Sequence, residues 1–86
     1  MTSYVLEVYK LNRAYEDQES LKDSTRLQHY ESDVPFASFH VGETISDGAA
    51  MTYYGRIQHI HHAVGGVSGG DIIHVVSLYV FDEESE

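Results

Sequence analysis

The hydrophobic residues of this chain are concentrated in two runs near its C-terminal end, residues 55–64 and 71–81. Both runs are rich in isoleucine and valine, which favour strands, and the glycine-rich residues 65–70 between them are typical of a turn. In the second run both faces of the alternating pattern are largely apolar, which predicts a central strand or one whose second face is covered by a loop or another subunit. The pattern therefore predicts a hairpin around which the rest of the chain packs.

The first of these runs does not alternate cleanly between apolar and polar residues. In a regular pleat, Ile57 lies on the opposite face from Ile60 and His62. A β-bulge near Gln58 or His59 would instead bring the two isoleucines to one side together with His62. Because bulges of this kind bend strands, the pattern is also compatible with a small, closed sheet.

Shorter strand candidates precede this hairpin. Residues 4–11 are rich in β-branched and aromatic side chains, which predicts a first strand. Residues 12–24 are polar and lack an apolar period, which indicates a surface loop or one short helix. The remaining candidates are residues 25–30, 44–45 and 49–54, the last two joined by Asp47-Gly48, a pair typical of type I′ hairpin turns.

Together these segments predict an all-β fold with at most one short helix, built as a small, strongly curled antiparallel sheet or an SH3-like barrel of about five to six strands. The run from Phe39 to Ile45, followed by Gly55-Arg56, resembles the spacing of small SH3-like and PUA-like barrels. That resemblance implies a barrel-like sheet and carries over no functional residue. We expect one β domain over residues 1–81 and an acidic tail over residues 82–86.

Composition narrows the classes of function. Five basic residues against 14 acidic ones give a formal net charge of -9, which opposes binding to nucleic acids and to anionic membranes. The chain has no cysteine, so disulfides and thiolate metal sites are excluded. With no apolar run near the roughly 20 residues of a membrane span and no leader pattern, we expect a cytoplasmic protein. Because a chain of 86 residues buries a small core, a homodimer is the expected supplement.

Three histidines are candidate metal ligands. In a strand, His59 and His61 share one face about 7 Å apart, and His74 on the next strand could complete a three-nitrogen set for zinc or nickel. The spacing superficially resembles the His-x-His strand of cupins, but the glutamate that should follow is missing and the chain is too short for that fold. The alternatives are surface histidines without a ligand and a pH-sensitive interface.

The sequence contains no motif in the structural context that catalysis requires. Residues 66–70 match the Gly-x-Ser-x-Gly pattern of a nucleophile elbow, but that motif requires a helix after the serine, and here a strand is predicted. Among the 14 acidic residues, no spacing singles out a pair for acid–base chemistry. We therefore expect a protein that is not an enzyme and that needs no cofactor.

The seven tyrosines favour protein binding, because a tyrosine ring offers a large contact area with a polar tip. They could equally complete a thin core. The leading hypothesis is a non-catalytic interaction or regulatory module that binds a protein partner of basic charge. One alternative is a small acidic inhibitor of the phage anti-defence type that blocks a cationic nucleic-acid-binding site, and another is a histidine-based metal-binding protein. The candidate partner-binding residues are Tyr53, Tyr54, Tyr79, Asp82, Glu83 and Glu84.

Overall fold

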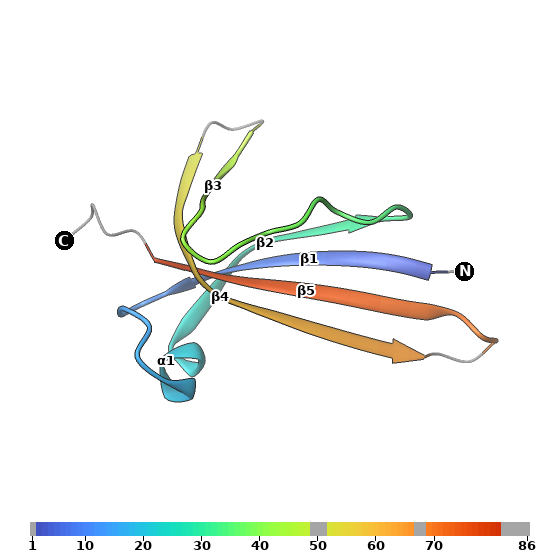
Figure 1. Ribbon diagram of the computed structural model, residues 1–86, viewed down its shortest axis with the longest axis horizontal. Coiled ribbons are helices and arrows are strands. Elements are labelled where there is room, and N and C mark those ends of the chain that lie inside the picture. Colours follow the sequence, from blue (N-terminus) through green and yellow to red (C-terminus); the bar gives the residue numbers. More distant parts are fainter. Residues whose placement is uncertain (1, 49–51, 67–68, 82–86) are drawn as a thin grey trace.

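The described part of the chain forms one curled β-sheet with a single short helix at its side, as the computed structural model shows (Figure 1). Residues 2–48, 52–66 and 69–81 are described. The predicted all-β fold, a small and strongly curled sheet, is confirmed. The elements in chain order are β1 (Thr2–Leu11), α1 (Gln18–Lys22), β2 (Ser24–Ser32), β3 (Thr44–Asp47), β4 (Thr52–Gly66) and β5 (Ile72–Phe81).

The five strands lie in the order β2-β1-β5-β4-β3. Strand β5 is central, as its two apolar faces predicted. The β1–β5 pair is parallel, whereas the other neighbouring pairs are antiparallel, so the sheet is mixed and differs from the antiparallel arrangement expected. Strand β5 runs antiparallel to β4, which precedes it, and β1 from the other end of the chain joins the free edge of β5 in the parallel sense.

Bulges curl the sheet into a half-barrel. The β4–β5 register shifts between Ile57 and His59, so Gln58 is the extra residue, and the bulge considered from the sequence is confirmed. A second shift, in the β3–β4 pair, leaves Tyr54 as the extra residue beside Gly55, whose φ of 139° strongly favours glycine. Each bulge bends β4 and increases its twist. Residues 52–56 of this strand can therefore pair with β3, and residues 56–66 pair with β5.

The sheet has an inner face that carries the core and an outer face that does not. Cross-strand pairs such as Leu6↔Val76 and Val8↔Leu78 lie on the inner face, and these four side chains are buried. Residues 33–43, the connection from β2 to β3, double back over the sheet and cover this face (Figure 1). The core consists of Leu6, Val8, Tyr54, Ile57, Val76, Leu78 and Val80, with Phe36, Phe39, Ile45 and Ile60 packed against it.

The connection from β1 to β2 agrees with its prediction, whereas the connection from β3 to β4 does not. The short helix expected within residues 12–24 is present, and Asp17 caps it by accepting hydrogen bonds from the backbone N–H groups of Glu19 and Ser20. The two-residue turn predicted at Asp47-Gly48 is wrong, because Asp47 itself pairs with Thr52 and the connection comprises residues 48–51. Of the strand predicted over residues 49–54, the first three residues lie outside the described residues. Within the part of the chain that is described, no helix is long and apolar enough to span a membrane.

Candidate binding sites on the two faces

The register of the sheet places the histidines on opposite faces. His59 and His61 lie opposite Tyr79 and Ser77 on the outer face, whereas His74 lies on the inner face. Side chains alternate with a period of two along a strand, so no rotamer brings His74 to the other two rings. The structure does not bring together the three predicted zinc or nickel ligands. Among the described residues, no group of three or more histidine or acidic side chains is arranged to hold a metal ion.

A different pair of histidines meets on the inner face. Nδ1 of His62 and Nε2 of His74 lie 3.0 Å apart, within hydrogen-bonding distance. His62 is opposite Val76, two residues beyond His74 on β5, so the rings are diagonal neighbours across the two strands. The bulge at Gln58 makes this contact possible, because it turns His62 toward the inner face. The sequence indicated the bulge that turns His62 inward, but the pairing of these two rings was not predicted.

The histidine pair lies beside a pocket between the inner face and residues 35–39. Its volume is about 180 Å³. Tyr4 of β1 approaches His74 edge-on, with ring centroids 6.1 Å apart. Most of the lining is apolar or aromatic, and the two imidazoles supply polar groups. The lining residues are Tyr4, Pro35, Phe36, Ala37, Ser38, Phe39, Ile60, His62, His74 and Val76.

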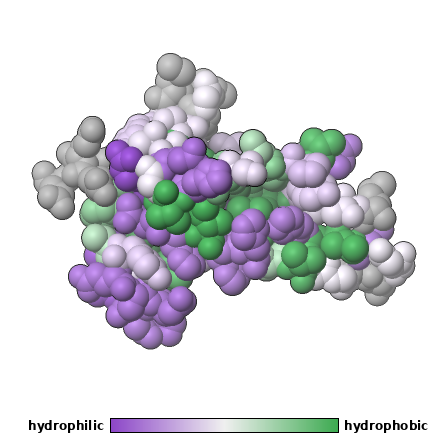
Figure 2. Space-filling view, in the orientation of Figure 1, coloured by the Kyte–Doolittle hydropathy of each residue, from purple (hydrophilic) through white to green (hydrophobic). Residues whose placement is uncertain are grey.

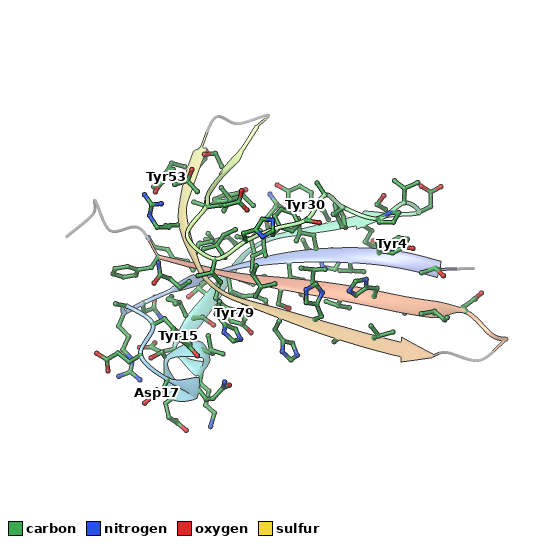
Figure 3. The ribbon with its side chains drawn as sticks, viewed as in Figure 1. Tyr4, Tyr15, Asp17, Tyr30, Tyr53 and Tyr79 are labelled. Atoms are coloured by element: carbon green, nitrogen blue, oxygen red, sulfur yellow. The ribbon has the colours of Figure 1, made fainter. Side chains whose placement is uncertain are left out.

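On the outer face, aromatic rings form a cluster near α1. The rings of Tyr9 and Tyr79 stack with centroids 5.1 Å apart, and Tyr15 stacks on His59 at 5.3 Å. A contact of 5.8 Å between His59 and Tyr79 joins the two pairs. Tyr15 and Tyr79 lie near the helix, whereas Tyr4 lies toward the far end of the sheet (Figure 3). We refer to Tyr9, Tyr15, His59 and Tyr79 as the aromatic cluster.

Burial and a nearby carboxylate change the acidity of two of these phenols. Burial raises the pKa of Tyr79, and the Glu7 carboxylate raises it further. Burial is also the largest cause of the raised pKa of Tyr9, followed by the charge of Glu7 and a hydrogen bond to it. Glu7 itself lies 3.3 Å from the Arg26 guanidinium and 3.8 Å from His29. Both phenols therefore stay neutral donors across the physiological range.

The outer face also carries a strip of aliphatic side chains, which the polar row of Glu7, Ser77 and His61 separates from the aromatic cluster. Val5, Ala63, Ile73 and Val75 lie there on three neighbouring strands, and we call them the outer strip. Three of them are half-buried and Ala63 is exposed. Extensive contacts between described elements occur only between neighbouring strands, so no second sheet packs on this strip. On the face of the molecule seen in Figure 2, which does not identify this strip, hydrophobic groups come to the surface between hydrophilic ones.

The tyrosines predicted to bind a partner do not share one surface. Tyr54 is only 9% exposed and belongs to the core, where its hydroxyl lies 3.5 Å from that of Tyr30. Tyr53 is exposed on the part of β4 that pairs with β3, and Tyr79 lies on the outer face (Figure 3). The predicted acidic contacts Asp82, Glu83 and Glu84 lie outside the described residues. Tyr9 and Tyr15, which join Tyr79, were missed because no local pattern distinguishes them.

The Gly-x-Ser-x-Gly match lies between two strands, β4 and β5, where a nucleophile elbow would require a helix. Ser68 itself lies outside the described residues. No family model matches this chain, and comparisons with curated proteins and with solved structures find no match either. A function is therefore inferred from the side chains of the two faces.

Proposed function

We propose that this protein is a non-catalytic interaction module that binds a protein partner through its outer face. The observation that carries the proposal is the outer strip, an aliphatic surface that lies one polar row away from the aromatic cluster and has no second layer of described elements over it. Half-buried aliphatic and tyrosine side chains on a rigid sheet are suited to contact, because they lose little conformational entropy on binding.

The charge of the chain supports a basic protein as the partner. At a formal net charge of -9, a basic protein is attracted over long range, whereas a second copy of this chain is repelled. Glu31 stands at the edge of the outer face, opposite Val5, with 77% of its side chain exposed. A partner with an aliphatic or aromatic centre and a basic rim fits this surface.

Two adjacent residues of β4 provide a matched test. Ala63 belongs to the outer strip and Val64 faces the other way, and both are exposed. Peptide ligands selected from a displayed library against the wild-type protein should combine apolar anchors with lysine or arginine. We expect Ala63→Lys to weaken their binding about tenfold or more, because it places a positive charge in an apolar contact with a basic ligand. Val64→Lys adds the same charge on the inner face and should change affinity less than about twofold.

Equal losses in the two variants, or no selectable ligand, would refute the proposal. Salt distinguishes it from the acidic-inhibitor alternative, in which the protein mimics nucleic acid. Contact through an aliphatic surface retains most of its affinity at high salt, whereas electrostatic mimicry loses affinity steeply. Selected ligands whose binding disappears at high salt, with no effect of Ala63→Lys at low salt, would favour the inhibitor.

A further inference from the structure

The inner-face pocket has the size of a single aromatic ring with one substituent. Its volume is about 180 Å³, and apolar cavities of about 150 Å³ in other proteins bind benzene. Phe36 and Phe39 from the covering segment face Ile60 and Val76 from the sheet, so an occupant would contact apolar groups from both sides. Such a lining favours a flat, apolar ligand.

The His62–His74 pair supplies ring nitrogens to the pocket, whose lining also includes the hydroxyl residues Tyr4 and Ser38. When both rings are neutral, each carries one N–H, and one of these N–H groups joins the two rings. Whichever ring donates, one of the two remaining ring nitrogens is an N–H donor and the other is an acceptor. The ring contact puts these two nitrogens on opposite sides of the pair, too far apart for one group to reach both. A hydroxyl group fits whichever of them an occupant meets, because it can act as donor or as acceptor, whereas an ammonium can only donate and a carboxylate can only accept.

We propose that this pocket binds a small, neutral hydroxyaromatic compound, with the ring between the phenylalanines and the sheet and the hydroxyl on the histidine pair. The net charge of -9 acts in the same direction, because it disfavours an anionic ligand. This site lies on the opposite face from the proposed partner surface and does not depend on it.

The covering segment is fixed at its C-terminal end. The Gly42 N–H donates to the Ile57 carbonyl at 2.9 Å, and the Ile57 N–H donates to the Glu43 carbonyl at 2.8 Å. The Glu43 carboxylate also accepts from the backbone N–H of His40 at 2.7 Å. These bonds join the segment to β4 immediately after the phenylalanines, so the pocket wall is held before a ligand arrives.

Phenol and toluene are the probes that test the proposal, because they differ only in the group that meets the histidines. Methyl and aromatic NMR of the wild-type protein should show phenol-induced shifts at Ile60 and Val76, with little change at the outer-face residues Val5 and Val75. In the His62→Leu, His74→Leu double variant we expect the ratio of phenol to toluene affinity to fall about tenfold, the size of one lost hydrogen bond.

His61→Leu is the matched control, because His61 is also a histidine of β4 but lies on the outer face. It should leave the phenol-to-toluene ratio unchanged. Saturation of the wild-type shifts needs no variant, so the test survives if the double variant does not fold. No saturable phenol shift at Ile60 and Val76, or the same fall in ratio in His61→Leu, would overturn the proposal.

A free phenol and a tyrosine side chain of another protein share this chemistry, and we assign the pocket to the free compound because of its small volume. N-acetyltyrosine amide separates the two sources, since it carries a peptide unit that the pocket has no room for. It should bind more weakly than phenol. Binding as tight as that of phenol, at the same residues, would assign the pocket to a partner's tyrosine and overturn the free-ligand assignment.

Discussion

At the scale of single residues, the outer face shows how burial modifies ordinary side chains. Tyr9 and Tyr79 both have a raised pKa because burial partly desolvates them beside Glu7. The stack of the two rings places both phenols within reach of that one carboxylate. Measuring the ionisation of these two phenols therefore shows whether the aromatic cluster is intact.

This effect predicts a loss of stability in alkali. The pKa of each phenol is higher in the folded than in the unfolded chain, so the unfolded state loses its protons first as the pH rises. The stabilising contribution is fully present below pH 10, the usual pKa of tyrosine, and is lost as the pH rises through the higher folded value. Urea unfolding at about pH 9 and about pH 11 should show a smaller loss for Tyr79→Phe than for the wild type.

Tyr53→Phe is the control for this measurement, because Tyr53 is exposed and lies away from the cluster. Its loss of stability should equal that of the wild type. If Tyr79→Phe and Tyr53→Phe behave alike, the desolvation of Tyr79 does not contribute to stability. Absorbance titration of the tyrosines gives an independent check, since one phenol that ionises above pH 10 in the folded protein should be missing in Tyr79→Phe.

At the scale of elements, β4 determines the shape of the molecule. It is 15 residues long, and its two bulges let it pair with β3 along one part and β5 along the other. The bulge at Gln58 also reverses which histidines face inward. One extra residue therefore assigns His62 to the pocket and His59 to the aromatic cluster.

Two glycines of β4 test the role of the bend. Gly55 has a φ of 139°, a conformation that side chains with a Cβ rarely adopt, whereas Gly65 has open space around it and no such φ. We expect Gly55→Ala to lower the free energy of unfolding by about 1–3 kcal/mol, because alanine is strained at that φ. Gly65→Ala should be neutral or slightly stabilising, since it reduces the entropy of the unfolded chain. Denaturant unfolding that ranks the two variants equally would show that the bend does not depend on Gly55.

At the scale of the whole molecule, charge and apolar surface oppose each other. The outer strip favours association, but two copies each carrying -9 repel one another. The dimer expected for so short a chain should therefore depend on salt. The repulsion between charges extends over about 30 Å at 0.01 M salt and over only about 3 Å at 1 M salt.

Light scattering at low and high salt measures this balance. We expect the mass of a monomer at low salt and a growing fraction of dimer at high salt in the wild type. Ala63→Lys should remain monomeric in both, because it places a charge in the outer strip, whereas Val64→Lys should behave as the wild type does. A dimer that persists at low salt would mean that a second copy, rather than a basic partner, covers the outer face.

The sequence by itself determined the mostly β character of the chain and the location of the core strand. A high content of β-branched and aromatic residues identified β1 and β5, and the absence of an apolar period over residues 12–24 limited that segment to a loop or one short helix. These features are local, since backbone preference and side-chain period act within a few residues. The broken alternation between Ile57 and Ile60 even indicated the bulge.

Only the tertiary structure decided which side chains meet. The sequence could group His59 with His61, but it could not show that His74 faces the other way, because that depends on the register between β4 and β5. It could count tyrosines, but the stack of Tyr9 on Tyr79 requires the parallel β1–β5 pair, which joins segments from the two ends of the chain. Both candidate sites are built from such long-range pairs. Their geometry is fixed only when the strands pair in the register of the folded sheet.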